Sequence, residues 1–322
     1  MYTMEDKMEK KENILNINEE IFDNQEPIDH EELSHNLWKI FFGIIIYVVL
    51  TQTLSGLFSK FSRLDAGLAM IISTLIPLLF LKLCLPNITI AQIYKNEKKQ
   101  LKLVDIPYFI GLMFLGTYLF TYISNLVTSS LDVDIENVMD VIKSLNSWPM
   151  FIYVVIIGPI VEETVYRGFL SQNLARYSKI AALVISTLIF AFMHINLEQA
   201  ITVLGMAFIL TYVGIFYSFK LSLILHIINN LQSMLMTNLI DAKGPESTEI
   251  IIYSLIVLII IAYSIYRFVR QGRLEFSENM RQNSQEKAYT KEILGSIQMI
   301  ALVLFFIVLM IVTVIGMSRL QQ

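Results

Sequence analysis

Pro149–Leu170 reads PMFIYVVIIGPIVEETVYRGFL, an apolar run of membrane-spanning length that nevertheless contains Glu162, Glu163 and Arg167. A helix needs about 20 mostly apolar residues to cross a bilayer. A charged side chain in the middle of such a helix costs roughly 2.5–3.5 kcal/mol on the insertion scale, so it marks a functional site. This stretch therefore predicts a membrane helix that carries a functional site.

The rest of the chain has the same apolar character. Its 322 residues are 55% hydrophobic and 16% charged, against about 45–50% and about 25% in soluble domains. Because hydrocarbon cannot satisfy an open backbone, the apolar runs must be helices. We predict an all-α, polytopic transmembrane helix bundle of nine spans, or eight because the fifth and seventh runs are short or interrupted. The predicted spans are Leu37–Phe58, Ala66–Pro86, Ile106–Thr128, Pro149–Leu170, Ile180–Ile195, Ala200–Phe219, Leu221–Ile240, Ile250–Arg267 and Ile297–Met317.

Composition divides the chain into four parts. Residues 1–36 hold eleven Asp or Glu against three Lys, which predicts a disordered acidic cytoplasmic tail. Residues 37–148 would form the amino-terminal transmembrane helices, and residues 149–240 a helical core with the site. Residues 241–322 would form the carboxyl-terminal helices, with a polar linker at 271–290.

Loop charges predict how the chain lies in the cell membrane. Four loops that fall on one side of the predicted spans carry most of the Lys and Arg, which makes that side cytoplasmic. The amino terminus would be cytoplasmic and the carboxyl terminus outside. The basic residues of these loops are Lys95, Lys98, Lys99, Lys102, Arg176, Lys179, Lys220, Arg267, Arg270, Arg273, Arg281, Lys287 and Lys291. The sequence has no basic nucleic-acid stripe, so no nucleic acid is expected as a partner, and its one cysteine excludes an intrachain disulfide.

The two adjacent glutamates are not equivalent. Glu163 and Arg167 are four residues apart in the favourable acid-first order, so they can neutralise each other. Glu162 lies about 100° round the helix and lacks this partner. An interfacial helix end held by a salt bridge would explain Glu163 and Arg167, but not Glu162.

Two histidines form the second signal. Phe190 and His194 are four residues apart in one apolar run, and His226 and Asn230 have the same spacing in another. A lone histidine in an apolar helix is often hydrogen-bonded glue between helices. However, an imidazole and a carboxamide on one face can also donate to a developing oxyanion. Alternatively, Asn229 and Asn230 bond neighbouring helices.

Together these patches resemble the CPBP family, also called Abi, of CAAX proteases and bacteriocin-processing or bacteriocin-immunity proteins. Its signature is Glu-Glu-x-x-x-Arg, then Phe-x-x-x-His, then His-x-x-x-Asn, in that order on separate apolar helices. The resemblance covers residues 149–240 and implies an intramembrane endopeptidase. The residues it implies are Glu162 and His194 to activate water, His226 and Asn230 to hold the oxyanion, and Glu163, Arg167 and Phe190 as structural support.

The sequence leaves the cofactor and the substrate open. We favour a metal-free glutamate-type peptidase, with zinc held by Glu162, His194 and His226 as the metal-dependent alternative; the compact His-Glu-x-x-His pattern is absent. The expected partners are the lipid bilayer and a peptide or membrane-protein substrate, for which a prenylated peptide and a bacteriocin precursor are both candidates. Two other functions remain: a non-catalytic immunity or secretion scaffold that binds peptides without cleaving them, and a cation transporter with a Glu/His ion site.

Overall fold

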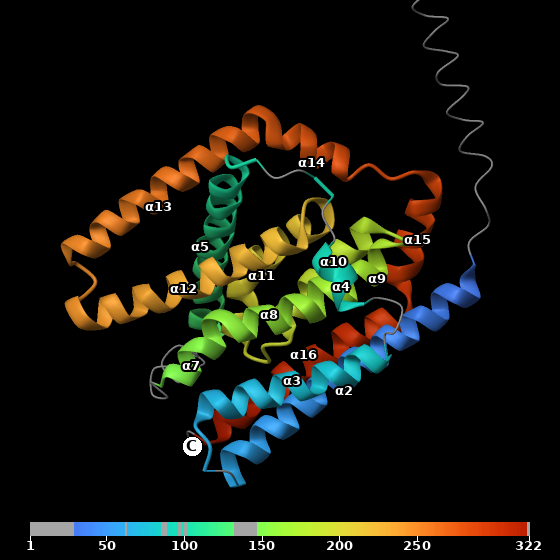
Figure 1. Cartoon of the computed structure of the whole chain (residues 1–322), viewed down its shortest axis with the longest axis horizontal. Coiled ribbons are helices and arrows are strands. Elements are labelled where there is room, and N and C mark those ends of the chain that lie inside the picture. Colours follow the sequence, from blue (N-terminus) through green and yellow to red (C-terminus); the bar gives the residue numbers. More distant parts are fainter. Residues whose placement is uncertain are drawn as a thin grey trace, which may run out of the picture.

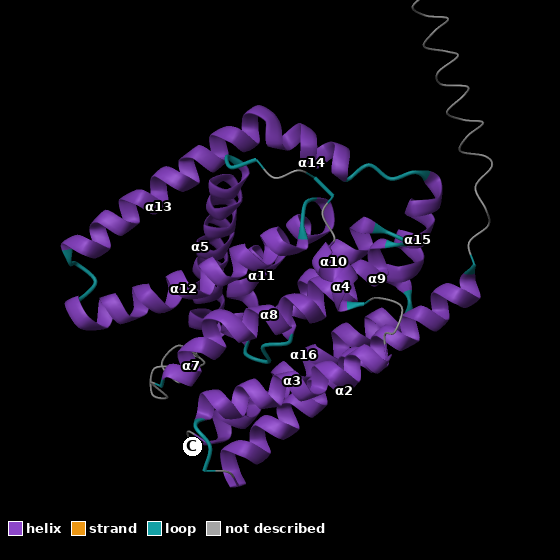
Figure 2. Cartoon of the chain, in the orientation of Figure 1, coloured by secondary structure: helices purple, strands orange, loops and turns teal. Residues whose placement is uncertain are grey.

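The computed structural model of the chain is almost wholly helical. Helix makes up 89% of it, and the part that it describes contains no strand (Figure 2). The prediction of an all-α polytopic bundle is therefore confirmed. The structure describes residues 29–61, 63–84, 89–95, 98–99, 102–131 and 147–320.

Within the described residues the elements follow one another with short turns. In chain order they are α2 (His30–Phe61), α3 (Ala66–Cys84), α4 (Ile90–Lys95), α5 (Asp105–Leu131), α7 (Trp148–Ile152), η1 (Tyr153–Ile157), α8 (Gly158–Glu163), η2 (Thr164–Ser171), α9 (Gln172–Ala175), α10 (Lys179–Phe192), α11 (Leu197–Phe216), α12 (Phe219–Lys243), α13 (Thr248–Arg267), η3 (Phe268–Gly272), α14 (Arg273–Asn279), α15 (Ser284–Gly295) and α16 (Ile297–Leu320). The η elements are π-helical turns. They are continuous with their α neighbours, so Trp148–Ala175 is one helical run.

Seven described helical runs are long and apolar enough to cross a membrane. An eighth crossing results if α15 and α16, which meet at a 45° bend, form one span. The fifth predicted span corresponds to α10, which has 14 residues and is as short as expected. The expectation that the seventh is short is wrong, since α12 is a full-length helix of 25 residues.

The amino-terminal boundary also differs from its prediction. Helix α2 begins at His30 rather than at Leu37, because Leu33 is already buried against the bundle. The last residues of the predicted tail are therefore part of the first helix. Residues 1–28 lie outside the described residues.

The run from α7 to α9 lies at the centre of the bundle (Figure 1). Helix α8 contacts α12 on one side and α3 on the other, and α10 and α11 pack against η2. On the far side α5 crosses α11 at Gly116 and Gly205, where a Cβ on Gly205 would lie 2.4 Å from the Gly116 carbonyl oxygen. The two backbones can approach this closely because neither residue has a side chain.

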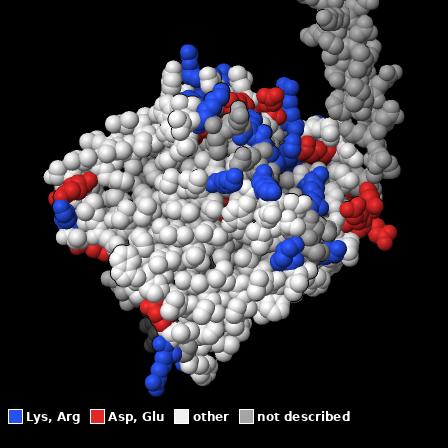
Figure 3. All heavy atoms as spheres, viewed as in Figure 1, with Lys and Arg blue, Asp and Glu red and all other residues white. Residues whose placement is uncertain are grey.

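The predicted polar linker, residues 271–290, includes α14 and part of α15. Helix α15 is attached to the start of α10, where the hydroxyls of Ser178 and Thr290 lie 2.6 Å apart and the Lys179 amide donates to Glu286. Its last turn also reaches the start of α2. The linker is therefore packed against the bundle. Lys and Arg side chains gather at this end of the molecule, around α4, α14 and α15 (Figure 3).

Candidate active site

The helix that carries the paired glutamates is distorted just before them. In η1 the Gly158 amide donates to the Tyr153 carbonyl, five residues earlier. The next donor in this register would be Pro159, which has no N–H. The Val154 carbonyl that it leaves unpaired accepts a hydrogen bond of 2.9 Å from Asn230 Nδ2 on α12. This bond ties α12 to the glutamate helix about two turns before Glu162.

Glu163 lies at the centre of a buried polar cluster. Its side chain is fully buried, and Oε1 lies 3.0 Å from Arg167 Nη1 and 2.9 Å from His226 Nδ1. Oε2 accepts a hydrogen bond of 2.6 Å from Ser222 Oγ. A buried carboxylate needs such partners to offset its lost hydration. Both oxygens of Glu163 are therefore already occupied.

Glu162 lies in a different environment. Its side chain is 20% exposed, and Oε2 lies 3.6 Å from His226 Nε2, too far for a direct hydrogen bond. His194, Tyr47 and Tyr153 are close enough to Glu162 to interact with it electrostatically. Glu162 is thus the partly exposed acid of the pair.

His194 lies past the end of α10, in the turn that leads to α11, and not inside a span as predicted. Its Nδ1 is 3.1 Å from the Phe190 carbonyl and 3.2 Å from the Ala191 carbonyl. Carbonyls only accept hydrogen bonds, so Nδ1 carries the hydrogen and Nε2 keeps its lone pair. The next residue, Ile195, has a φ of 56°, and Asn196 then caps α11 by accepting from the Gln199 amide.

The left-handed conformation of Ile195 leads to a prediction. A β-branched residue is strained at this φ, by about 1–2 kcal/mol, whereas asparagine tolerates it. Ile195→Asn is expected to raise the stability of the fold by about 1 kcal/mol, which the thermal midpoint in detergent measures. The variant should keep its peptidase activity, which the cleavage rate measures. Ile195→Pro cannot reach this φ and should displace His194 and lower the rate. A lower midpoint for Ile195→Asn would contradict the argument.

Phe190 connects the remaining groups. Its ring packs edge-on against His194 at 5.4 Å and against His226 at 5.7 Å. The Arg167 guanidinium lies 3.9 Å from the centre of the same ring, an attractive cation–π arrangement. The motif phenylalanine therefore separates and orients the two imidazoles and the cation.

The structure brings the predicted residues of all three motifs together. Sequence reasoning missed Ser222, which lies one turn before His226 on the same face of α12, and Tyr47, which reaches the site from α2 outside the motifs. Asn229 is buried, and its Oδ1 lacks a hydrogen-bond partner. The Ser222 spacing was visible as Ser-x-x-x-His, whereas nothing in the sequence indicated Tyr47.

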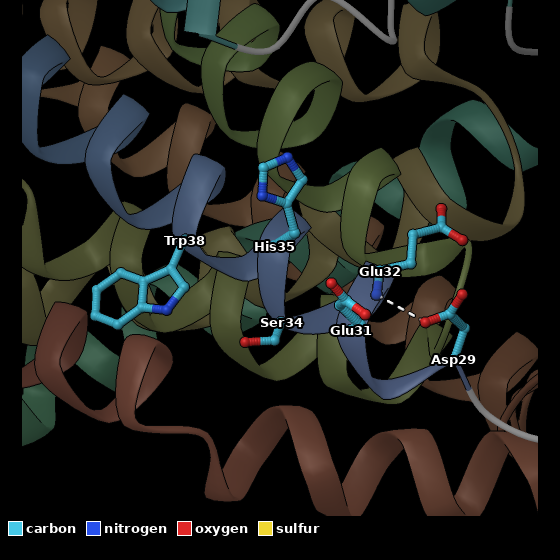
Figure 4. Close-up of a pocket in the computed structure, with 6 residues that line it drawn as sticks. All are labelled: Asp29, Glu31, Glu32, Ser34, His35 and Trp38. Atoms are coloured by element: carbon cyan, nitrogen blue, oxygen red, sulfur yellow. Dashed lines mark hydrogen bonds between the residues drawn. The ribbon is translucent and has the colours of Figure 1, made fainter.

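A zinc site can be tested against the geometry. Among the described residues, no three His, Cys, Asp or Glu side chains are grouped so that they could hold a metal ion. The described side chains therefore do not fit the zinc alternative. A separate surface pocket at the start of α2 is lined by Asp29, Glu31, Glu32, Ser34, His35 and Trp38 (Figure 4). It includes none of the predicted site residues.

The site contains an accessible carboxylate, two imidazoles and a buried ion pair, and it lies inside a multi-pass helical bundle. Such groups are suited to hydrolysis within a membrane. Residues 144–232 match the family model of Rce1-like proteins, the type II CAAX prenyl endopeptidases. This part of the chain is thus similar to the Rce1-like type II CAAX prenyl endopeptidases, and the resemblance inferred from its motifs is confirmed. Neither a curated protein nor a solved structure matches the chain. The match leaves α2 to α5 and α13 to α16 outside.

Proposed function

We propose that this protein is an intramembrane endopeptidase that hydrolyses a peptide bond with a water activated by Glu162 and His194. The Rce1-like match supports a CAAX-type endopeptidase in general. One observation supports these roles most: Glu163 is occupied by Arg167, Ser222 and His226, whereas Glu162 beside it is partly exposed. Of the two acids, Glu162 is the one free to act as a base.

Glu162 and His194 would share the attacking water. The Nε2 lone pair of His194 is available because Nδ1 faces two backbone carbonyls. The water oxygen attacks the scissile carbonyl carbon while its proton passes to the Glu162–His194 pair. When the tetrahedral intermediate collapses, the C–N bond breaks and the same proton goes to the leaving amine. Water and peptide bond are consumed, and one acid and one amine are formed.

His226 and Asn230 would stabilise the oxyanion. Because Glu163 accepts from Nδ1 of His226, a donor at Nε2 requires a doubly protonated ring, whose charge the two glutamates balance. Asn230 uses one N–H for the Val154 carbonyl and keeps the other. Loss of one oxyanion donor typically costs about 10²–10³ in rate.

Membrane context and substrate follow from the same features. We propose that the protein lies in the cell membrane with its amino terminus and the basic end of Figure 3 in the cytoplasm, in accord with the positive-inside rule. Its substrate would be a prenylated peptide, a bacteriocin precursor or a loop of another membrane protein. The family description names prenyl endopeptidases, which favours the prenylated peptide as the first substrate to test.

The test is a comparison of membrane proteomes. Cells that express the wild-type chain are compared with cells that express Glu162→Gln at equal levels, and peptide termini are mapped by mass spectrometry. The proposal expects new termini in one or a few proteins with the wild type alone. If the wild type and Glu162→Gln give identical peptide termini and both support the same phenotype, the protein acts as a binding scaffold and not as a peptidase.

Chelation gives an independent prediction. Because the proposed chemistry uses side chains alone, o-phenanthroline followed by dialysis is expected to leave the cleavage rate of the purified protein unchanged. The rate is measured with the substrate found above, before and after zinc is added back. A rate that falls on chelation and returns with zinc would assign the metal-dependent mechanism.

A further inference from the structure

We infer that Asn229 is a positioning residue of the site, which holds the carboxamide of Asn230 in the orientation that leaves an N–H free for the oxyanion. This inference rests on the proposed function for the role of Asn230. It adds a residue that lies outside the three motifs and acts on the reaction through its neighbour. It also gives a reason for a buried acceptor that the fold leaves unpaired.

The orientation of the Asn230 carboxamide is set by a break in the backbone hydrogen bonding of the glutamate helix. Pro159 has no N–H, so the Val154 carbonyl is left open and accepts a hydrogen bond of 2.9 Å from Asn230 Nδ2. A carbonyl cannot donate, so the nitrogen end of the carboxamide must face this helix. The oxygen end of the same carboxamide therefore points to another side.

Asn229 contacts that oxygen end. Its Nδ2 donates to Asn230 Oδ1 over 3.4 Å. This hydrogen bond is long, but its direction follows from the bond to Val154, because the Asn230 oxygen can only accept. The Asn230 carboxamide is thus held at both ends, by the backbone of η1 and by a side chain of α12. With one hold alone, its plane could swing about the remaining bond.

The two asparagines differ in burial. Asn229 is 9% exposed, whereas Asn230 is partly accessible. Asn229 follows the buried Ser222 by seven residues and the buried His226 by three, so it continues the buried face of α12. Of the two carboxamides, that of Asn230 is therefore the one placed to contact a substrate, and Asn229 acts through it.

Asn229 is a poor choice for packing alone. Its Oδ1 atom is buried and has no hydrogen-bond partner among the described residues. An unpaired buried acceptor destabilises a fold, and an apolar side chain of similar shape avoids that cost. Exceptions of this kind are expected at functional sites. Here the compensating gain is the donor that Asn229 supplies to Asn230.

The experiment compares Asn229→Leu, Asn230→Ala and the variant that combines both. Cleavage of a fluorogenic farnesylated peptide is measured over a range of concentrations, so that kcat and KM are separated. Asn238→Leu is the matched control, because it makes the same change at an exposed position of α12. A second measurement needs no substrate: hydrogen exchange of the Asn230 side-chain amide, followed by NMR with isotope-labelled asparagine, reports how firmly this carboxamide is held.

Asn229→Leu is expected to lower kcat about tenfold, a part of the 10²–10³ that an oxyanion donor supplies, and to leave KM unchanged. The thermal midpoint should not fall, because the unpaired acceptor is gone. In the Asn230→Ala background the substitution should have almost no further effect on kcat. Exchange of the Asn230 amide should become about two- to tenfold faster, the factor that one neutral hydrogen bond contributes. Asn238→Leu should change none of these quantities.

Equal exchange rates of the Asn230 amide in the wild type and in Asn229→Leu would overturn the inference, and so would effects of the two substitutions on kcat that simply multiply. The exchange rate also separates the two proposals. If exchange is faster in Asn229→Leu but Asn230→Ala cleaves like the wild type, Asn229 positions Asn230 and the proposed oxyanion role is wrong. If Asn230→Ala is nearly inactive and exchange is unchanged, the proposed function holds and Asn229 has no positioning role. If the wild type does not cleave the peptide, the exchange rate alone decides.

Discussion

Glu162→Gln is expected to abolish peptide cleavage and to leave the fold intact. The variant keeps the size of the side chain and removes its ability to take a proton from water. Glu162 is partly exposed and lies 3.6 Å from His226 Nε2, and His226 keeps its closer contact with Glu163, so the fold should tolerate the change. Removal of a general base typically lowers the rate by about 10²–10⁴. The initial cleavage rate and the thermal midpoint of the purified variant measure the two effects.

Glu163→Gln is the matched control, since it makes the same chemical change one residue along. Here the neutralised group is the one that pairs with Arg167 and His226, so the thermal midpoint should fall as well as the rate. The proposed roles require that Glu162→Gln loses cleavage alone, whereas Glu163→Gln loses both cleavage and thermal stability. Equal activity of Glu162→Gln and the wild type would end the assignment of Glu162 as the base.

Arg167→Met is expected to cause the largest loss of stability of any single change in the core. Its guanidinium is fully buried, pairs with Glu163, stacks on Phe190 and donates to the Ala207 carbonyl. Without it Glu163 remains as a buried carboxylate, and breaking a buried pair in this way costs about 3–5 kcal/mol. The variant should unfold at a much lower temperature in detergent and accumulate poorly in membranes.

A second substitution separates charge from packing. In the double variant that combines Arg167→Met with Glu163→Gln, the stranded charge is gone, so most of the lost stability should return. Cleavage should not return, because a glutamine no longer holds His226 with the same charge. If the double variant is as unstable as Arg167→Met alone, Arg167 stabilises the fold through packing and not through its charge.

Most of the fold could be predicted from hydrophobicity alone, because hydrocarbon forces each long apolar run to be a helix. The starting boundaries of α5, α13 and α16 fall within two residues of the predicted spans. The errors arose where tertiary contacts decide the boundary. Leu33 extends α2 because the bundle covers it, and α10 ends before His194 because Ile195 adopts a left-handed conformation.

The composition of the candidate site was predictable because three motifs carry costly groups into apolar helices. The contacts between these groups were not predictable from the sequence. Sequence spacing indicated that Glu163 pairs with Arg167, but not that the same carboxylate also binds His226 and Ser222. These contacts depend on the depth and rotation of α12 relative to the glutamate helix. Periodicity within one helix carries no information about that relation.

The attachment of α15 has a practical consequence for protein production. Helix α15 joins the start of α10 through Ser178 and Thr290, and Glu292 also meets His30 at the beginning of α2. An excised fragment limited to residues 144–232 would lose these anchors and expose apolar surface that α3, α5 and α16 normally cover. Such a fragment should aggregate on extraction, so expression plasmids for biochemistry need to encode the chain from α2 through α16.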